Sequence, residues 1–185
     1  MVTARLSDYR VLVAPGLYNS DAGHWQSRWQ HKYPAFERVE QDDWARPDLA
    51  AWSARLDQAR GADPRATLIV AHSFGCLAAV DSVVRERRGV AGLLLVAPAD
   101  PGRFGLEQVL PRQALPCPSI VISSSDDPWM AIEHARLWAS RWHSEFVEAG
   151  ALGHINAASG LGDWAFGLDR LAALLERADQ ARRAP

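Results

Sequence analysis

The chain has 185 residues, of which 48% are hydrophobic and 23% are charged, and its formal net charge is −2. This length suits one domain with a single core, and the composition is that of a globular protein, which excludes intrinsic disorder. The small net charge gives no electrostatic reason to bind nucleic acid or an anionic membrane, so we expect neither as a partner.

Apolar segments and helical stretches alternate along the chain. The predicted strands are Arg10–Ala14, Glu37–Glu40, Thr67–Ala71, Val90–Ala97, Ser119–Ser123 and Glu145–Glu148. The predicted helices are His24–Tyr33, Pro47–Ala59, Phe74–Arg87, Trp129–Trp142 and Asp163–Ala178. Several strands are continuous runs of β-branched residues or leucine, which is typical of parallel strands covered on both faces.

This alternation predicts an α/β fold: one parallel sheet of about six strands with helices on both faces and right-handed crossovers. We expect residues 1–185 to form a single domain whose last residues, about 180–185, fray. Two helix starts have local signals. Pro47 suits the first turn of a helix, and Asp163 can cap the last one.

Targeting and cysteine signals are weak. The first residues, MVTARLSDYRVLVAPG, contain no apolar stretch of signal-peptide length, and the longest apolar run, VAGLLLVAPA, is about half a membrane span. We therefore expect a cytoplasmic protein. Cys76 and Cys117 have no metal-ligand spacing, and we expect both to stay reduced, with one disulfide between them as the alternative.

The segment VAHSFGC, residues 70–76, joins a predicted strand to a predicted helix. Its small-x-Ser-x-Gly pattern is that of a nucleophile elbow, which needs small residues around the serine because neighbouring backbone comes close. Ser73 would project at a helix amino terminus, where N–H groups stabilise a nearby anion. Ala71 stands where glycine is usual and is small enough to keep the match. Alone, the pattern is also compatible with an ordinary turn.

A serine nucleophile requires a base and an acid, which in this sheet type follow it in the order acid, then histidine. His154, in GALGHIN between the last predicted strand and the last predicted helix, stands in the required place. His72 lies on the elbow itself and cannot easily approach the hydroxyl. The remaining histidines precede the serine or lie in or at the end of a predicted helix: His24, His31, His134 and His143.

Three aspartates are candidates for the acid. Asp126 and Asp127 lie in SSSDDPW after the fifth predicted strand, and Asp100 follows the fourth. We favour Asp127, which directly precedes Pro128, and expect Asp126 to hold the loop through side-chain-to-backbone hydrogen bonds. Asp126 and Asp100 remain alternatives.

The segment APGLYNSDAGHWQ follows the first predicted strand. Its Pro–Gly turn can present the N–H of Leu17 towards the serine, and together with the N–H of Phe74 it would form an oxyanion hole. Trp25, Trp129 and Phe104 are candidates for the substrate pocket. For Trp25, which is spaced from Trp29 by one helical turn, core packing is the competing interpretation.

Six segments together resemble the small serine hydrolases of the retinoblastoma-binding protein 9 and YdeN-like family: PGLYNSDAGHWQSRW, QDDW, AHSFGC, VAPAD, SSSDDP and GHIN. The resemblance runs from the first predicted strand to the last predicted helix. It implies an α/β-hydrolase fold with a six-stranded parallel core and a triad of Ser73, Asp127 and His154. The LxCxE pattern that binds retinoblastoma-type pocket proteins is missing, since LPCPS lacks the glutamate, so we expect no such partner.

The sequence therefore predicts a serine hydrolase that cleaves small carboxylic esters or amides through an acyl-enzyme, with no metal or organic cofactor. Residues 98–118, where larger hydrolases insert a lid, are short and interrupted by prolines, so we expect no cap domain. Two alternatives stay open: a scaffold with little or no activity that serves as a binding protein, and an acyltransferase. The triad does not separate esters from thioesters or amides, and the sequence leaves the oligomeric state undecided.

Overall fold

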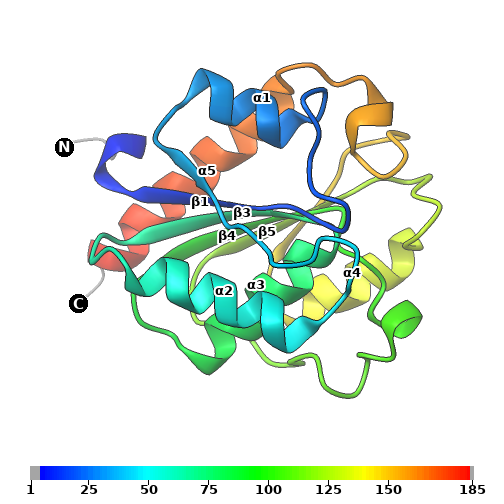
Figure 1. Cartoon of the computed structure of the whole chain (residues 1–185), viewed down its shortest axis with the longest axis horizontal. Helices are drawn as coiled ribbons and strands as arrows, with labels where there is room; N and C mark the ends of the chain where they lie inside the picture. The colour runs from blue at the N-terminus through cyan, green and yellow to red at the C-terminus, as the bar shows by residue number, and fades with distance from the viewer. Residues whose placement is uncertain (1–4, 184–185) are drawn as a thin grey trace.

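The structure, a computed structural model of the chain that describes residues 5–183, is built on a parallel sheet in the order β2-β1-β3-β4-β5-β6 (Figure 1). The strands are β1 (Arg10–Ala14), β2 (Phe36–Arg38), β3 (Thr67–His72), β4 (Val90–Val96), β5 (Ser119–Ser123) and β6 (Glu145–Glu148). Each strand is parallel to its neighbours. Loops that follow neighbouring strands therefore meet at one edge of the sheet.

Helices cover both faces of the sheet. Helices α1 (Trp25–Lys32) and α5 (Ala165–Arg183) lie on one face, and α2 (Leu49–Gly61), α3 (Phe74–Arg85) and α4 (Ile132–Arg141) lie on the other (Figure 1). Short 3-10 helices occupy Leu6–Asp8 (η1), Pro101–Phe104 (η2) and Ala157–Ser159 (η3). The predicted fold class is confirmed. Between β4 and β5 the chain forms η2 and loops, without a cap domain.

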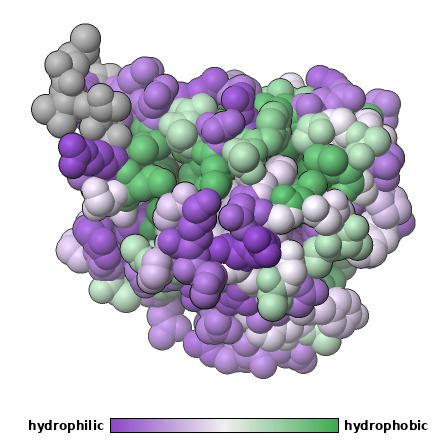
Figure 2. Space-filling view, turned by 90° about the horizontal axis from the view of Figure 1, so that it is seen from above, coloured by the Kyte–Doolittle hydropathy of each residue, from purple (hydrophilic) through white to green (hydrophobic). Residues whose placement is uncertain are grey.

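The continuous apolar strands are explained by two core clusters. In β3, Ile69 and Ala71 pack with the α2, α3 and α4 layer, whereas Leu68 and Val70 pack with α1 and α5. Successive side chains of a strand point to opposite faces, so each strand must be apolar at every position when helices cover both faces. Figure 2 shows the α1 and α5 side from outside, where apolar residues lie among polar ones. Phe166 of α5 is an exposed apolar side chain in this layer.

Two predicted helix starts are wrong. Asp48 caps α2 by accepting a hydrogen bond from the N–H of Ala51 at 3.0 Å, so Pro47 precedes the cap and does not lie in the first turn. Asp163 does not cap α5, which begins at Ala165. Its carboxylate instead forms an ion pair with Arg28 of α1 at 2.6 Å, a contact between segments far apart in the sequence.

The carboxyl-terminal helix is longer than predicted. Helix α5 continues to Arg183, beyond the predicted end at Ala178. The expected fraying of about residues 180–185 stays a prediction. Arg183 pairs with Asp179 one turn earlier, at 2.9 Å, which supports the last turn. Residues 184 and 185, the rest of the predicted frayed end, lie outside the described residues.

Candidate active site

Ser73 occupies a sharp turn between β3 and α3. Its backbone has φ 53° and ψ −123°, a conformation that residues with a side chain rarely adopt. Its N–H donates to the carbonyl of Val96 at 3.1 Å, and its carbonyl accepts from the N–H of Ala99 at 3.2 Å. The turn is thus held by β4 and the segment that follows it, and the side chain of Ser73 faces a pocket.

Two glycines allow the loop after β1 to press against this turn. A Cβ on Gly75 would lie 2.4 Å from the carbonyl oxygens of both Ala14 and Pro15. A Cβ on Gly16 would lie 2.6 Å from the Cβ of Ser73. The glycine of the elbow pattern therefore has a steric cause here: the backbone after β1 approaches residue 75 closer than any side chain permits.

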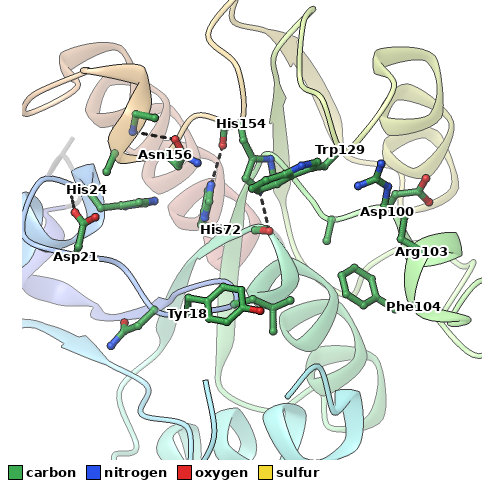
Figure 3. A pocket seen from close by; sticks show the side chains of 16 residues that line it. Tyr18, Asp21, His24, His72, Asp100, Arg103, Phe104, Trp129, His154 and Asn156 are labelled. Carbon is green, nitrogen blue, oxygen red and sulfur yellow. Dashed lines mark hydrogen bonds between the residues drawn. The ribbon is translucent and has the colours of Figure 1, made fainter. Parts of the chain in front are cut away.

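Three loops bring three polar side chains into one hydrogen-bonded chain. His154 Nε2 lies 2.9 Å from the Oγ of Ser73 (Figure 3). On the other side of the ring, His154 Nδ1 lies 2.7 Å from Oδ2 of Asp127. The side chains of His154 and Asp127 are 4% and 2% exposed. The second oxygen of Asp127, Oδ1, accepts the backbone N–H of Trp129 at 2.9 Å. A carboxylate placed in this way orients the imidazole so that Nε2 faces the serine hydroxyl.

The other two candidate acids have different partners. Oδ1 of Asp126 accepts the N–H of Gly153 at 2.7 Å and the hydroxyl of Ser124 at 2.7 Å. These bonds, that from Ser124 first, lower the pKa of Asp126 below its usual value. Asp100 caps η2 through the N–H of Gly102. The structure thus places Asp127 at the imidazole and uses Asp126 to join two loops.

The backbone groups predicted for the oxyanion hole lie beside Ser73. Phe74 is the first residue of α3, and N–H groups in a first helical turn have no partner within the helix. In the loop after β1, Tyr18 donates to Trp44 and Asn19 donates to Gly16. No residue between 5 and 183 accepts the N–H of Leu17, which lines the same pocket as Ser73. Both N–H groups are therefore free to bind an anion.

Replacing Gly16 by alanine should reduce kcat for an ester substrate about 10- to 100-fold, because the new Cβ must displace either its own loop or Ser73. Steady-state kinetics with a thermal melt would measure the effect. The matched control is Gly61→Ala at the end of α2, where an added Cβ has no atom within 4 Å. An unchanged kcat in Gly16→Ala would show that the close approach of this loop is not needed.

A pocket of about 490 Å³ opens above Ser73. Phe104 and Trp129 lie on one side of it, and His24 and Asn156 on the opposite side (Figure 3). The ring of Trp129 packs against the imidazole of His154, with centroids 4.4 Å apart. Asp100 and Arg103 line the same side as Phe104 and Trp129, so that side carries both charged and aromatic groups (Figure 3). His24 and Asn156 lie across the serine from it.

The expectation that Trp25 lines this pocket is wrong. Trp25 is 1% exposed and packs against Trp29 and Trp164 in the core cluster beneath α1. Its Nε1 donates to the carbonyl of Ile155 at 2.8 Å. Helix α1 turns this side chain towards the sheet, so the core-packing interpretation holds for Trp25.

Sequence reasoning missed His24 as a residue that lines the pocket. His24 caps α1 by accepting the N–H of Gln26 at Nδ1, and its ring packs edge-on against His72 with centroids 4.7 Å apart. Burial is the first cause that lowers the pKa of His24 from 6.5 to about 4, and the charges of Arg38 and His154 lower it further. Asp21 acts in the opposite direction. No spacing rule singles out His24, since histidine is an unusual helix cap.

We expect His24 to make the stability of the protein sensitive to acid. Because the pKa of His24 is about 4 in the folded state and near 6.5 in the unfolded state, only the unfolded state binds its proton between these values. The free energy of unfolding should therefore fall as the pH falls from 6.5 to 4, with about 3 kcal/mol of the loss due to His24. Urea unfolding at several pH values would measure it.

The variant His24→Asn should make this dependence less steep, because asparagine keeps the helix cap and removes the His24 ring, while the buried ring of His72 remains. The matched control, His31→Asn, removes an exposed imidazole from the same helix and leaves the buried one in place. If His24→Asn kept the full slope between pH 6.5 and 4, the attribution to His24 would be wrong.

Among residues 5–183, no group of three or more histidine, cysteine or acidic side chains could hold a metal ion. Cys76 and Cys117 are free thiols, and burial raises the pKa of Cys117 to about 12. No helix in the described range has the length and apolar character that crossing a membrane requires.

Comparison with known proteins gives consistent matches. Residues 11–173 match a family model described as serine hydrolase. The chain is 37% identical to a YdeN-like hydrolase from Pectobacterium atrosepticum, over 93% of each chain, with a TM-score of 0.90. The YdeN protein of Bacillus subtilis is 19% identical over 90% of this chain and 98% of its own, with a TM-score of 0.76.

More distant structures share the fold alone. An esterase from Rhodococcus is 14% identical over 95% of this chain and 94% of its own, with a TM-score of 0.65. No protein with a curated function matches the chain.

Proposed function

The chain belongs to the serine hydrolase family, and on this basis we propose that it hydrolyses small carboxylic esters or amides through an acyl-enzyme on Ser73. The observation that carries the proposal is the continuous contact from the Ser73 hydroxyl through both nitrogens of His154 to Asp127. A serine is a poor nucleophile without a base, and this arrangement supplies the base in the required orientation.

In the first half of the reaction, His154 Nε2 takes the hydroxyl proton as Oγ of Ser73 attacks the substrate carbonyl carbon. Asp127 holds the Nδ1 proton and stabilises the imidazolium that forms. The N–H groups of Leu17 and Phe74 bind the negative oxygen of the tetrahedral intermediate. His154 then gives its proton to the leaving alcohol or amine, the bond to the leaving group breaks, and the acyl group remains on Ser73.

The second half repeats these steps with water. His154 removes a proton from a water molecule as its oxygen attacks the acyl carbon, and the same N–H groups bind the oxyanion. The bond to Oγ breaks, Ser73 recovers its proton from His154, and the carboxylic acid leaves. The substrate and one water molecule are thus converted to a carboxylic acid and an alcohol or amine, and the enzyme is regenerated.

The size of the site supports small substrates. A volume of about 490 Å³ is in the lower half of the range for small-molecule pockets. Among the elements of residues 5–183, none forms a cap domain over the site or the wall of an enclosed tunnel for a long acyl chain. Phe104 and Trp129 offer apolar surface to an acyl or leaving group on one side of Ser73.

A panel of chromogenic esters with acyl chains of two to sixteen carbons, together with aminoacyl amides, tests the proposal. We expect the highest kcat/KM for short acyl groups. Turnover of none of these by folded protein would contradict the proposal and favour a binding protein on a hydrolase scaffold. Adding an alcohol or amine as a competing acceptor identifies an acyltransferase, because the transfer product would then exceed the free acid.

A further inference from the structure

Two consecutive carbonyl groups beside the imidazole of His154 are each bound by a buried ring N–H. His72 Nε2 lies 3.0 Å from the carbonyl oxygen of His154, and Trp25 Nε1 donates to the carbonyl of Ile155 at 2.8 Å. His72 and Trp25 are 5% and 1% exposed. The first of these bonds is drawn in Figure 3. The loop is therefore held from β3 and from α1, two elements far from it in the sequence.

The loop has a backbone conformation that needs such support. Ile155 has φ 48°, in the left-handed region where a β-branched residue is a genuine outlier, and Gly153 has φ 59° on the other side of His154. A residue with such a strained backbone keeps its conformation only where surrounding packing and hydrogen bonds hold it in place. Ile155 is fully buried in the same apolar cluster as Trp25, so packing and hydrogen bonding act on the same turn.

His72 is suited to this role because it stays a donor. A carbonyl oxygen only accepts hydrogen bonds, so Nε2 of His72 carries the proton in this contact. Burial, with the neighbouring rings of His24 and His154, keeps the pKa of His72 well below its usual value. The ring therefore remains neutral beside His154, whose ring centroid is 4.9 Å away, and does not compete for the catalytic proton.

We propose that His72 and Trp25 are positioning residues: together they hold the strained turn at residues 154 and 155 and thereby fix the imidazole between Ser73 and Asp127. The inference rests on the proposed function, since it concerns the same triad. Neither side chain touches the reacting atoms. Their loss misplaces the base, and a displacement of about 1 Å is enough to reduce the rate about 100-fold.

The chain offers a matched pair of tryptophans as a test. Trp29 lies one turn after Trp25 on α1, is equally buried, and its Nε1 also donates to a backbone carbonyl at 2.8 Å. That carbonyl belongs to Asp163, outside the catalytic loop. Trp25→Phe should lower kcat about 10- to 100-fold with KM changed less than about threefold, whereas Trp29→Phe should lower the melting temperature similarly with kcat unchanged.

The second arm of the test replaces His72. His72→Phe keeps an aromatic ring and removes the donor, and should lower kcat about 10- to 100-fold. His72→Gln places an amide N–H near the position of Nε2 and should restore most of the rate. Because His72 and Trp25 act on one turn, the effects of their variants should not be independent. The fold-loss of kcat in the double variant His72→Phe/Trp25→Phe should be smaller than the product of the two single fold-losses.

A proton NMR measurement separates this inference from the proposed function. The His154 Nδ1 proton bonded to Asp127 should give a downfield signal in the wild type and in Trp29→Phe that is lost or broadened in Trp25→Phe and His72→Phe. Retention of that signal, or an unchanged kcat, in both anchor variants would overturn the inference. The signal does not depend on turnover, so a wild type without hydrolase activity would refute the proposed function and still test the anchors.

Discussion

Replacing Ser73 by alanine should lower the turnover of a short acyl ester by at least about 10⁴-fold and leave the melting temperature nearly unchanged. The hydroxyl is the group that attacks the carbonyl in the proposed reaction, and no other side-chain oxygen lies within hydrogen-bond distance of His154 Nε2 among the described residues. The methyl group of alanine fits where the Cβ of serine already lies, so the turn keeps its conformation. Steady-state assays of the purified variant measure the loss.

The residual rate of Ser73→Ala also has an expected origin. The backbone N–H groups of Leu17 and Phe74 remain, and an oxyanion hole alone retains some catalysis over water. Activity above about one tenth of the wild type, after removal of contaminating esterases, would show that Ser73 is not the nucleophile.

The second large effect should come from Asp127. Asp127→Asn replaces a carboxylate that accepts the Nδ1 proton of His154 by an amide that can present its N–H group there, which favours the wrong tautomer of the imidazole. We expect a decrease in kcat of about 10⁴-fold with little change in stability. The kinetics of the purified variant at saturating ester would measure it.

The neighbouring residue supplies the control. Asp126→Asn keeps an oxygen that can accept the N–H of Gly153, so the two loops stay joined, and we expect less than about a tenfold loss. If Asp126→Asn were the more damaging variant, the roles of the two aspartates would have to be exchanged. The comparison is direct because both variants remove one negative charge from adjacent positions.

The fold was predictable because most strands are recognisable from their own residues, as continuous apolar runs. The bounds of β1, β5 and β6 are the predicted ones. Strand β2 lies at the edge of the sheet, is only half buried after Phe36, and begins one residue earlier than predicted. Exposure at the sheet edge alone does not explain this difference, because β6, the other edge strand, is no more buried and has the predicted bounds.

The candidate site was predictable to the level of loops. The order of serine, acid and histidine along a parallel sheet restricts which loops can meet, and the structure brings Ser73, Asp127 and His154 within hydrogen-bond distance. Their catalytic roles remain predictions. The choice between Asp126 and Asp127 depends on side-chain directions in one turn, which chain order does not contain.

The unpredicted features depend on contacts between distant segments. The spacing of Trp25 and Trp29 by one helical turn is compatible with a place in the core and with a place in the pocket wall. Only the orientation of α1 about its axis relative to the sheet decides between these two positions. Aspartate is a favourable helix cap, but the carboxylate of Asp163 forms an ion pair with Arg28 of another helix. The anchoring bond of His72 joins residues 82 positions apart. Local propensity carries no information on such pairings.

The central claim is that His154 and Asp127 make Ser73 a nucleophile. Its most direct measurement is the reaction of folded wild-type protein with a fluorophosphonate probe, followed by intact mass and peptide mapping. We expect one adduct per chain, located on Ser73, formed far more slowly in His154→Ala and not at all in Ser73→Ala. Folded wild-type protein that stays unmodified, or an adduct on a different residue, would contradict it.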